Sequence, residues 1–224
     1  MTVDPIWERI HATREWGKYP PEELVRFAAT RFGSSVRKDI RILDVGCGFG
    51  SGTWLLAREG FDTSAIDGSA SAIRRLSERL AAEALSAKLH VGDIVTRLPD
   101  LFQPESFDAI VEITCLCTLP RAEAAQVVRQ AARLLKPGGR LFSMTFDVES
   151  WGHGLGIEVE PHGFTNIPEG PFKDRGFARF DAEENLAELY HPLSITSLES
   201  STRSLLNRTR TIKQWVIECE HVHG

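Results

Sequence analysis

The sequence of 224 residues contains no uninterrupted apolar run that approaches the roughly 20 residues of a membrane-spanning helix. Its first residues, M-T-V-D-P-I-W-E-R-I, place charged side chains where a secretory signal would need an apolar core. It also lacks a long basic stripe, and its net charge of −5 argues against a protein that binds nucleic acid mainly by charge. We therefore expect a cytoplasmic protein with no membrane or nucleic-acid partner.

Cysteine is scarce, and its spacing does not suit a metal site. The four cysteines are Cys47, Cys115, Cys117 and Cys219. Cys115 and Cys117 are too close in sequence for a zinc knuckle, which needs paired ligands at a wider spacing. We therefore predict no bound metal, and we expect the thiols to lie in the core or along a pocket.

The sequence also has no internal repeat and no low-complexity tract. With 42% hydrophobic and 25% charged residues, its composition is that of an ordinary globular protein. Its length suits one large domain with a full core and is short for two independent domains. Residues 1–224 are therefore expected to form a single domain.

Residues 40–52, I-R-I-L-D-V-G-C-G-F-G-S-G, are the most informative stretch. An apolar run at 40–45 is followed by alternate glycines, and an apolar, helix-compatible pattern begins at Thr53. This order predicts a buried strand, a tight turn and a helix whose first N–H groups favour a carboxylate or phosphate. A dinucleotide-binding turn needs a third glycine at the sixth position from Gly46, where this sequence has Ser51.

Two aspartates follow the next predicted strands. The strand at 61–66 ends in Asp67, and a carboxylate at this place in a βαβ unit can accept hydrogen bonds from both ribose hydroxyls. The alternative role for Asp67 is the N-cap of the next helix, which Ser69 or Ser71 can also cap. A third, short strand precedes Asp93, which is the second candidate ligand contact. The alternative is that Asp93 only forms a surface turn.

The second half of the chain predicts two more strands, two helices and a closing pair of strands. The last two strands are joined without a helix, so they are expected to be antiparallel neighbours. The predicted segments are a strand at 106–112, a helix at 121–135 that ends at Lys136-Pro137-Gly138-Gly139, a strand at 140–146, a helix at 181–190, and strands at 193–198 and 212–219.

Three segments resemble class I S-adenosylmethionine (SAM) dependent methyltransferases of the small-molecule type. They read D-V-G-C-G-F-G from Asp44, F-D-A-I-V-E-I-T-C-L-C-T-L-P from Phe107, and A-R-L-L-K-P-G-G-R-L-F from Ala132. The resemblance covers residues 40–146, with the segments in the family's order. It implies an α/β fold with a Rossmann-like, seven-stranded, mostly parallel sheet, an antiparallel last strand and helices on both faces.

The resemblance also implies SAM as the cofactor and S-adenosyl-L-homocysteine (SAH) as the product. Asp67 would hold the ribose, Asp93 and Ile94 would hold the adenine, and the glycine turn would hold the methionine end. The implied cofactor-binding residues are Asp44, Gly46, Cys47, Gly48, Asp67, Gly68, Asp93, Ile94, Glu112 and Ile113.

The segment before this core is expected to cover the cofactor. Residues 1–36 are predicted to form a helical cap, with two helices within 5–32 that are separated around 17–21. Trp16 and Tyr19 at this break are candidate cofactor contacts. The alternative is that both aromatic rings only fix the segment to the core.

Residues 147–180 are rich in glycine and proline and are expected to form an irregular insertion that acts as a substrate lid. His153 and His162 are its candidate substrate-binding residues, and their titration range also suits a general base. The resemblance places Cys117 towards the substrate as well. No other catalytic side chain is assigned.

The predicted reaction is transfer of the SAM methyl group to an oxygen, nitrogen or carbon atom of a small-molecule acceptor by in-line displacement. Holding the two reactants in place can lower the barrier by roughly 7–11 kcal/mol. The alternatives are a nicotinamide-dependent oxidoreductase and a SAM-binding protein without turnover. The expected assembly is a monomer or a homodimer.

Overall fold

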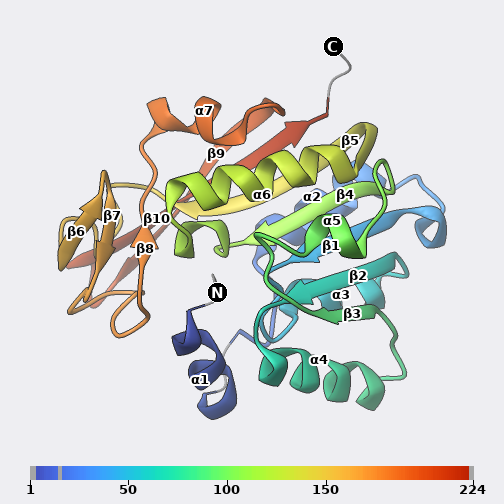
Figure 1. Cartoon of the computed structure of the whole chain (residues 1–224), viewed down its shortest axis with the longest axis horizontal. Helices are drawn as coiled ribbons and strands as arrows, with labels where there is room; N and C mark the ends of the chain where they lie inside the picture. Colours follow the sequence, from blue (N-terminus) through green and yellow to red (C-terminus); the bar gives the residue numbers. More distant parts are fainter. Residues whose placement is uncertain (1–3, 15–16, 222–224) are drawn as a thin grey trace.

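The computed structural model describes residues 4–14 and 17–221. Its centre is a seven-stranded sheet with the order β3-β2-β1-β4-β5-β10-β9 (Figure 1). Neighbouring strands from β3 to β5 are parallel, whereas β10 is antiparallel to both β5 and β9. The predicted fold class is therefore confirmed. The strands are β1 Arg41–Val45, β2 Asp62–Asp67, β3 Lys88–Val91, β4 Phe107–Ile113, β5 Leu135–Phe146, β9 Ser194–Leu205 and β10 Arg210–Glu220.

Helices cover both faces of this sheet. Helices α2 and α3 pack on one face, with α4 beside them, and α5, α6 and α7 pack on the other face. In Figure 1, α6 crosses in front of the sheet. Strand β1 gives Ile42 to the first face and Leu43 to the second, and this double burial explains its continuous apolar run. The helices are α1 Pro5–Thr13, α2 Glu22–Phe32, α3 Ser51–Arg58, α4 Ala70–Ala82, α5 Leu98–Leu101, α6 Arg121–Leu134 and α7 Leu186–Tyr190.

The N-terminal region has the predicted form of two separate helices. Helix α1 ends at Thr13, and α2 begins at Glu22 directly after Pro21. The fixed φ of proline and the acidic residues Glu22 and Glu23 both favour a helix start at this place. Within residues 4–14 and 17–221, no helix has the length and apolar character that crossing a bilayer would require.

Residues 147–180, called the insertion below, are not irregular as the sequence suggested. They contain a second sheet with the order β6-β7-β8. Phe164, Phe172 and Phe180 pack with Phe146 of β5 in a separate aromatic cluster. The sequence did not reveal this core because its aromatic residues have neither a helical nor a strand period. The strands are β6 Ile157–Glu160, β7 Gly163–Thr165 and β8 Ala178–Arg179.

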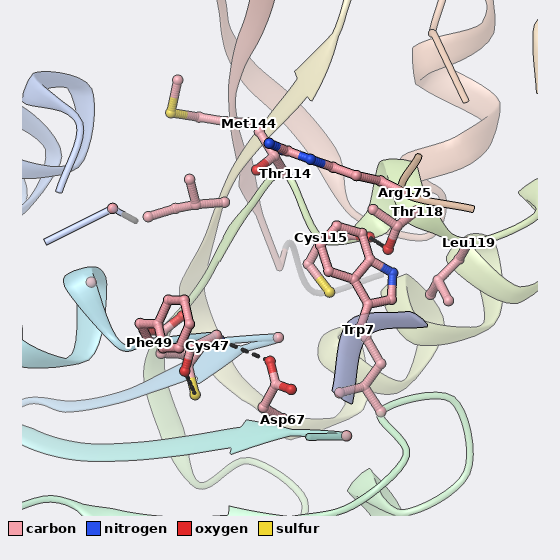
Figure 2. A pocket seen from close by; sticks show the side chains of 18 of the residues that line it. Trp7, Cys47, Phe49, Asp67, Thr114, Cys115, Thr118, Leu119, Met144 and Arg175 are labelled. Atoms are coloured by element: carbon pink, nitrogen blue, oxygen red, sulfur yellow. Dashed lines mark hydrogen bonds between the residues drawn. The ribbon is translucent and has the colours of Figure 1, made fainter. Parts of the chain in front are cut away.

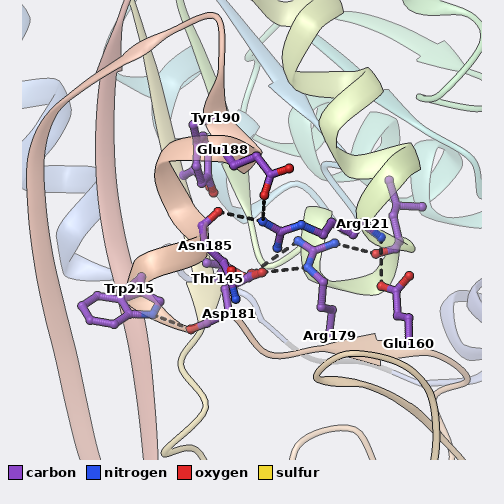
Figure 3. Close-up of polar contacts among 11 residues, drawn as sticks. Arg121, Thr145, Glu160, Arg179, Asp181, Asn185, Glu188, Tyr190 and Trp215 are labelled. Atoms are coloured by element: carbon purple, nitrogen blue, oxygen red, sulfur yellow. Dashed lines mark hydrogen bonds and ion pairs between the residues drawn. The ribbon is translucent and has the colours of Figure 1, made fainter.

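A buried ion pair anchors the insertion to the main sheet (Figure 3). The Arg179 Nε and Asp181 Oδ1 atoms are 2.8 Å apart, and both side chains are buried. Arg179 also donates to the Leu119 carbonyl at 2.7 Å, while Asp181 accepts from the Thr145 hydroxyl at 2.6 Å. Trp215 of β10 donates to the Asp181 carbonyl at 2.8 Å. Removal of either partner would leave an uncompensated buried charge and should be strongly destabilising.

Several boundaries differ from the sequence-based expectation. Strand β5 begins at Leu135 rather than Arg140, and its Gly138 N–H donates to the His221 carbonyl. The predicted helix at 181–190 is divided into a 3-10 turn, Glu183–Asn185, and the short α7. The hairpin of β9 and β10 is longer than predicted, because residues with exposed polar side chains pair through their backbones.

Candidate active site

A cavity of about 690 Å³ opens where the parallel strands end. Its wall comes from the turns after β1, β2 and β3, the end of β4, helix α1 and the insertion (Figure 2). Open parallel sheets bind their ligands at this edge. The predicted cofactor residues on the wall are Tyr19, Asp44, Gly46, Cys47, Gly48, Asp67, Gly68, Asp93, Ile94 and Ile113.

The turn after β1 needs glycine for its conformation and for its packing. Gly46, Gly48 and Gly50 have φ values of 67°, 51° and 72°. A Cβ on Gly46 would overlap the Cys115 sulfur, and one on Gly50 would overlap α4. A Cβ on Gly48 would meet His11 Nε2 at 3.6 Å, which is an ordinary contact. Packing within the protein therefore explains the first and third glycines.

Asp44 at the end of β1 is buried and fixes the start of α3. Its Oδ2 accepts a hydrogen bond from the Thr53 hydroxyl at 2.7 Å. Burial raises the pKa of Asp44 to about 6, and the Thr53 hydrogen bond opposes this shift. A Cβ on Gly52 would lie 2.9 Å from the Asp44 oxygen, so glycine leaves room for this carboxylate.

Asp67 at the end of β2 connects the glycine turn to α4. Its Oδ2 accepts from the Gly48 N–H and its Oδ1 from the Ser69 N–H, both at 2.8 Å. Burial raises the pKa of Asp67. The N-cap of α4 is Ser69, whose hydroxyl accepts from the Ala72 N–H at 3.1 Å. Of the two roles that the sequence allowed for Asp67, the N-cap therefore belongs to Ser69.

Asp93 and Ile94 lie beyond β3 on the same wall. The Asp93 Oδ1 accepts from the Val95 N–H at 2.9 Å, and the Asp93 carbonyl accepts from Thr96 and Arg97. Asp93 therefore begins a turn, which was the alternative, and it also lines the cavity, where its contact with the adenine stays a prediction. Ile94 is buried in the core beside the cavity.

Tyr19 lies on the cavity wall, although 69% of its surface is exposed. Its ring meets the Trp54 ring of α3 edge-on, with the centroids 6.2 Å apart. Tyr19 thus lines the cavity and also joins its segment to the core. Trp16, the other aromatic candidate in this segment, lies outside the described residues.

Glu112 and Cys117 do not line the cavity, in contrast to the expectation. The Glu112 Oε2 accepts from two N–H groups of the turn after β4, at 3.0 and 3.1 Å, and its Oε1 accepts from the Ser143 hydroxyl. Side chains alternate along a strand, so Glu112 faces the core while Ile113 faces the cavity. Cys117 is buried in the aromatic cluster of the insertion.

The buried Glu112 carboxyl predicts a stability that depends on pH. Burial raises its pKa to about 7 from an ordinary value of 4.5. The unfolded chain therefore releases this proton at a lower pH than the folded chain does. The stability from this group is complete below pH 4.5 and is lost as the pH rises to about 7, by at most about 1.4 kcal/mol per pH unit.

We expect Glu112→Gln to remove this dependence. Relative to the wild type, the free energy of unfolding of the variant should increase by about 1–3 kcal/mol between pH 5 and pH 8. Urea unfolding at the two pH values measures the difference. Glu105→Gln, at an exposed carboxylate, is the control, and because it keeps Glu112 its free energy of unfolding should follow that of the wild type between the two pH values. A difference for Glu112→Gln that is the same at both pH values would contradict the expectation.

His153 and His162 contact each other inside the insertion and do not line the cavity. Their Nε2 and Nδ1 atoms are 3.0 Å apart. The His153 ring packs edge-on against Phe164 and Phe180, with centroids 5.4 and 5.5 Å away. Burial, with a further effect of His162, lowers the pKa of His153. The fold of the second sheet therefore directs both imidazoles to each other, away from the place expected for them.

Helix α1 supplies cavity residues that the sequence did not reveal. Its Glu8 carboxylate accepts from the hydroxyls of Ser69 and Ser71 at 2.5 and 2.6 Å, and from the Ser71 N–H at 3.2 Å. These hydrogen bonds, that of the Ser69 hydroxyl foremost, lower the pKa of Glu8. Trp7 and His11 both line the cavity. Their spacing of four residues, which places them on one helix face, was the signal in the sequence.

The two ends of α1 contact different parts of the protein. At its C-terminal end, Arg75 of α4 donates to the carbonyls of Ala12 and Arg14 at 3.1 and 2.8 Å. At its N-terminal end, Asp4 lies against the insertion, where a Cβ on Gly176 would overlap the Asp4 Oδ2. Helix α1 therefore bridges α4 and the insertion beside the cavity.

Comparisons with known proteins agree with this geometry. A family model described as "Methyltransferase domain" matches residues 42–139. The ubiquinone biosynthesis O-methyltransferase of Xylella fastidiosa (strain M23) is 33% identical over 141 residues, which cover 62% of this chain and 55% of the relative. The same enzyme of Xanthomonas oryzae pv. oryzae (strain PXO99A) is 37% identical over 150 residues, which cover 65% and 60%. The chain thus spans little more than half the length of these relatives.

Comparison of the fold with solved structures also finds methyltransferases, and the match covers a larger part of the chain. A SAM-dependent methyltransferase from Methanosarcina mazei superposes with a TM-score of 0.70 at 22% identity, and the match covers 86% of this chain and 97% of that chain. The sheet order and the glycine turn beside the cavity are those of a Rossmann-like methyltransferase fold. Residues 42–139 thus match a methyltransferase domain, and the chain has the fold of the class I SAM-dependent methyltransferases.

Proposed function

We propose that this protein transfers a methyl group from SAM to a small-molecule acceptor. The observation that carries the proposal is one cavity in which the glycine turn, Asp67 and Asp93 meet. When bound, SAM would supply a methyl group on a sulfonium, which an oxygen, nitrogen or carbon nucleophile displaces in line. The protein then has to hold both reactants and exclude water, and such positioning contributes roughly 7–11 kcal/mol.

The cavity wall suits a cationic nucleoside. Asp67 would accept hydrogen bonds from the ribose hydroxyls, and Asp93 with Ile94 would hold the adenine. Gly46 and Gly48 line the cavity without side chains at the place where the methionine end would lie. Carboxylates favour a positive sulfonium nearby. Among the described wall residues, the carboxylates are Asp4, Asp44, Asp67, Asp93 and Glu123, against one guanidinium, Arg175.

The same charges disfavour a nicotinamide dinucleotide, whose pyrophosphate would lie among carboxylates. A thermal-shift comparison tests this alternative. We expect SAM and SAH to raise the Tm and NAD to leave it unchanged, because a ligand at 100 times its Kd adds about 2.7 kcal/mol of stability. A larger shift with NAD than with SAH would contradict the proposal.

A protein that binds SAM without turnover is the second alternative. The cavity continues from the cofactor residues to the insertion, which supports room for an acceptor. Methyl transfer from labelled SAM to fractions of a small-molecule extract separates the two cases. A labelled product supports turnover, whereas SAH binding with no labelled fraction supports the alternative.

The proposal includes a cytoplasmic location and a monomeric or homodimeric protein without nucleic-acid or membrane partners. Residues 1–36 serve as the cofactor cap and residues 147–180 as the substrate lid. The free thiols suit a reducing compartment. They are Cys47, Cys115, Cys117 and Cys219.

A further inference from the structure

The part of the cavity formed by the insertion is bounded by aromatic side chains. Phe146 and Phe172 meet edge-on, with ring centroids 4.7 Å apart and planes at 67°. Phe177 and Leu119 also line this part. Such a wall favours an apolar or aromatic molecule, because flat rings gain both buried area and edge contacts there.

A tight turn places Arg175 in this apolar surrounding. The Arg175 N–H donates to the Phe172 carbonyl at 3.1 Å, and the neighbours Asp174 and Gly176 have positive φ values of 57° and 78°. Figure 2 shows Arg175 reaching into the cavity from the side of Thr118 and Leu119. Asp4, another residue of the cavity wall, packs against Gly176 of this turn.

The electrostatic setting of Arg175 favours an anion. Burial lowers the pKa of Arg175, and the positive charge of Arg14 lowers it further. Among the wall residues in the described parts of the chain, Arg175 is the one arginine, and no lysine is present. A guanidinium that is partly removed from water gains most from a carboxylate, which accepts two parallel hydrogen bonds.

We propose that the methyl acceptor is an aromatic carboxylate, with its carboxylate on Arg175 and its ring against Phe146, Phe172 and Phe177. This inference rests on the proposed function and narrows it to a substrate class. Arg175 is a specificity-determining residue in this view. It fixes which end of the acceptor points towards the insertion and therefore which end points towards the cofactor residues.

The test is binding of two matched probes, 4-hydroxybenzoate and 4-hydroxybenzamide, to the SAH-saturated protein by calorimetry. The probes have nearly the same shape and differ in charge. We expect the wild type to bind the carboxylate at least about tenfold more tightly than the amide. Arg175→Gln should remove this preference, and Arg175→Lys should keep part of it because the charge remains. Lys173→Gln removes an exposed charge from the same turn and should behave as the wild type.

Three results would overturn the inference. The first is equal binding of both probes by the wild type, the second is an unchanged preference in Arg175→Gln, and the third is no binding of either probe. A fourth concerns the cofactor. If Arg175→Gln weakens SAH but not 5′-methylthioadenosine, which lacks the amino-acid tail, Arg175 holds the cofactor carboxylate instead. Failure of SAH to bind the wild type would contradict the proposed function itself, so the two failures are distinguishable.

Discussion

Gly46→Val is expected to abolish SAH binding while leaving a folded protein. The valine would have to adopt a φ of 67°, which costs about 1–3 kcal/mol for a residue other than glycine. Its Cβ would also overlap the Cys115 sulfur, so the turn would have to move away from the end of β4. The Gly48 N–H, which donates a hydrogen bond to Asp67, would move with the turn. Calorimetric titration should show an affinity at least about 100-fold below that of the wild type, a loss of about 2.7 kcal/mol.

Gly60→Val is the matched control for backbone strain. Gly60 has a φ of 88° and no atom within 4 Å of an added Cβ, and it does not line the cavity. We expect it to lose stability and to keep its SAH affinity. If Gly46→Val does not fold, Gly46→Ala carries the same overlap with less strain. Normal SAH binding by a folded Gly46 variant would show that the turn does not shape the cofactor site.

Asp67→Ala is expected to weaken SAH binding by about 2 kcal/mol, which is about 30-fold. The carboxylate would accept hydrogen bonds from the ribose, and the buried environment makes each of them costly to lose. Asp67 also holds the Gly48 and Ser69 N–H groups, so loss of affinity alone does not separate the two roles. A second ligand is needed for that purpose.

SAH that lacks the ribose 2′-hydroxyl separates the ribose contact of Asp67 from its structural role in the turn. The wild type should bind this analogue more weakly than SAH, whereas Asp67→Ala should bind both ligands about equally. Asp62→Ala, at the opposite end of the same strand, is the control and should keep the preference. An Asp67→Ala protein that still distinguishes the two ligands would assign the ribose to another residue.

The part of the cavity at the strand ends could be predicted because it depends on short-range order. In a parallel sheet the residues that follow each strand meet at one edge, so Asp44, Asp67 and Asp93 needed only correct strand ends. The misplaced Glu112 follows from the same geometry. It shares a face of β4 with Ile110, two residues earlier, and that face packs in the core. Strand alternation would have excluded Glu112 from the cavity.

The part of the cavity formed by the insertion could not be predicted because it depends on contacts between distant segments. The turn that carries Arg175 contacts Asp4 through Gly176, and Arg179 further along the insertion donates to the Leu119 carbonyl. No periodic pattern marks these contacts in the sequence. The prediction for His153 shows the limit of reasoning from residue type, since the fold packs this side chain against Phe164 and Phe180 inside the insertion.

Helix α1 contacts two separate parts of the protein beside the cavity. Its Glu8 accepts a hydrogen bond from Ser69 at the start of α4, and Asp4 at its N-terminal end packs against Gly176 of the insertion. A molecule that displaced the helix as a unit would disturb the contacts at both of its ends. Thermodynamic linkage then requires reciprocity: whatever the methyl donor does to the affinity for the acceptor, the acceptor does in equal measure to the affinity for the donor. Any coupling between the two substrates of the proposed reaction would therefore pass through a nine-residue helix.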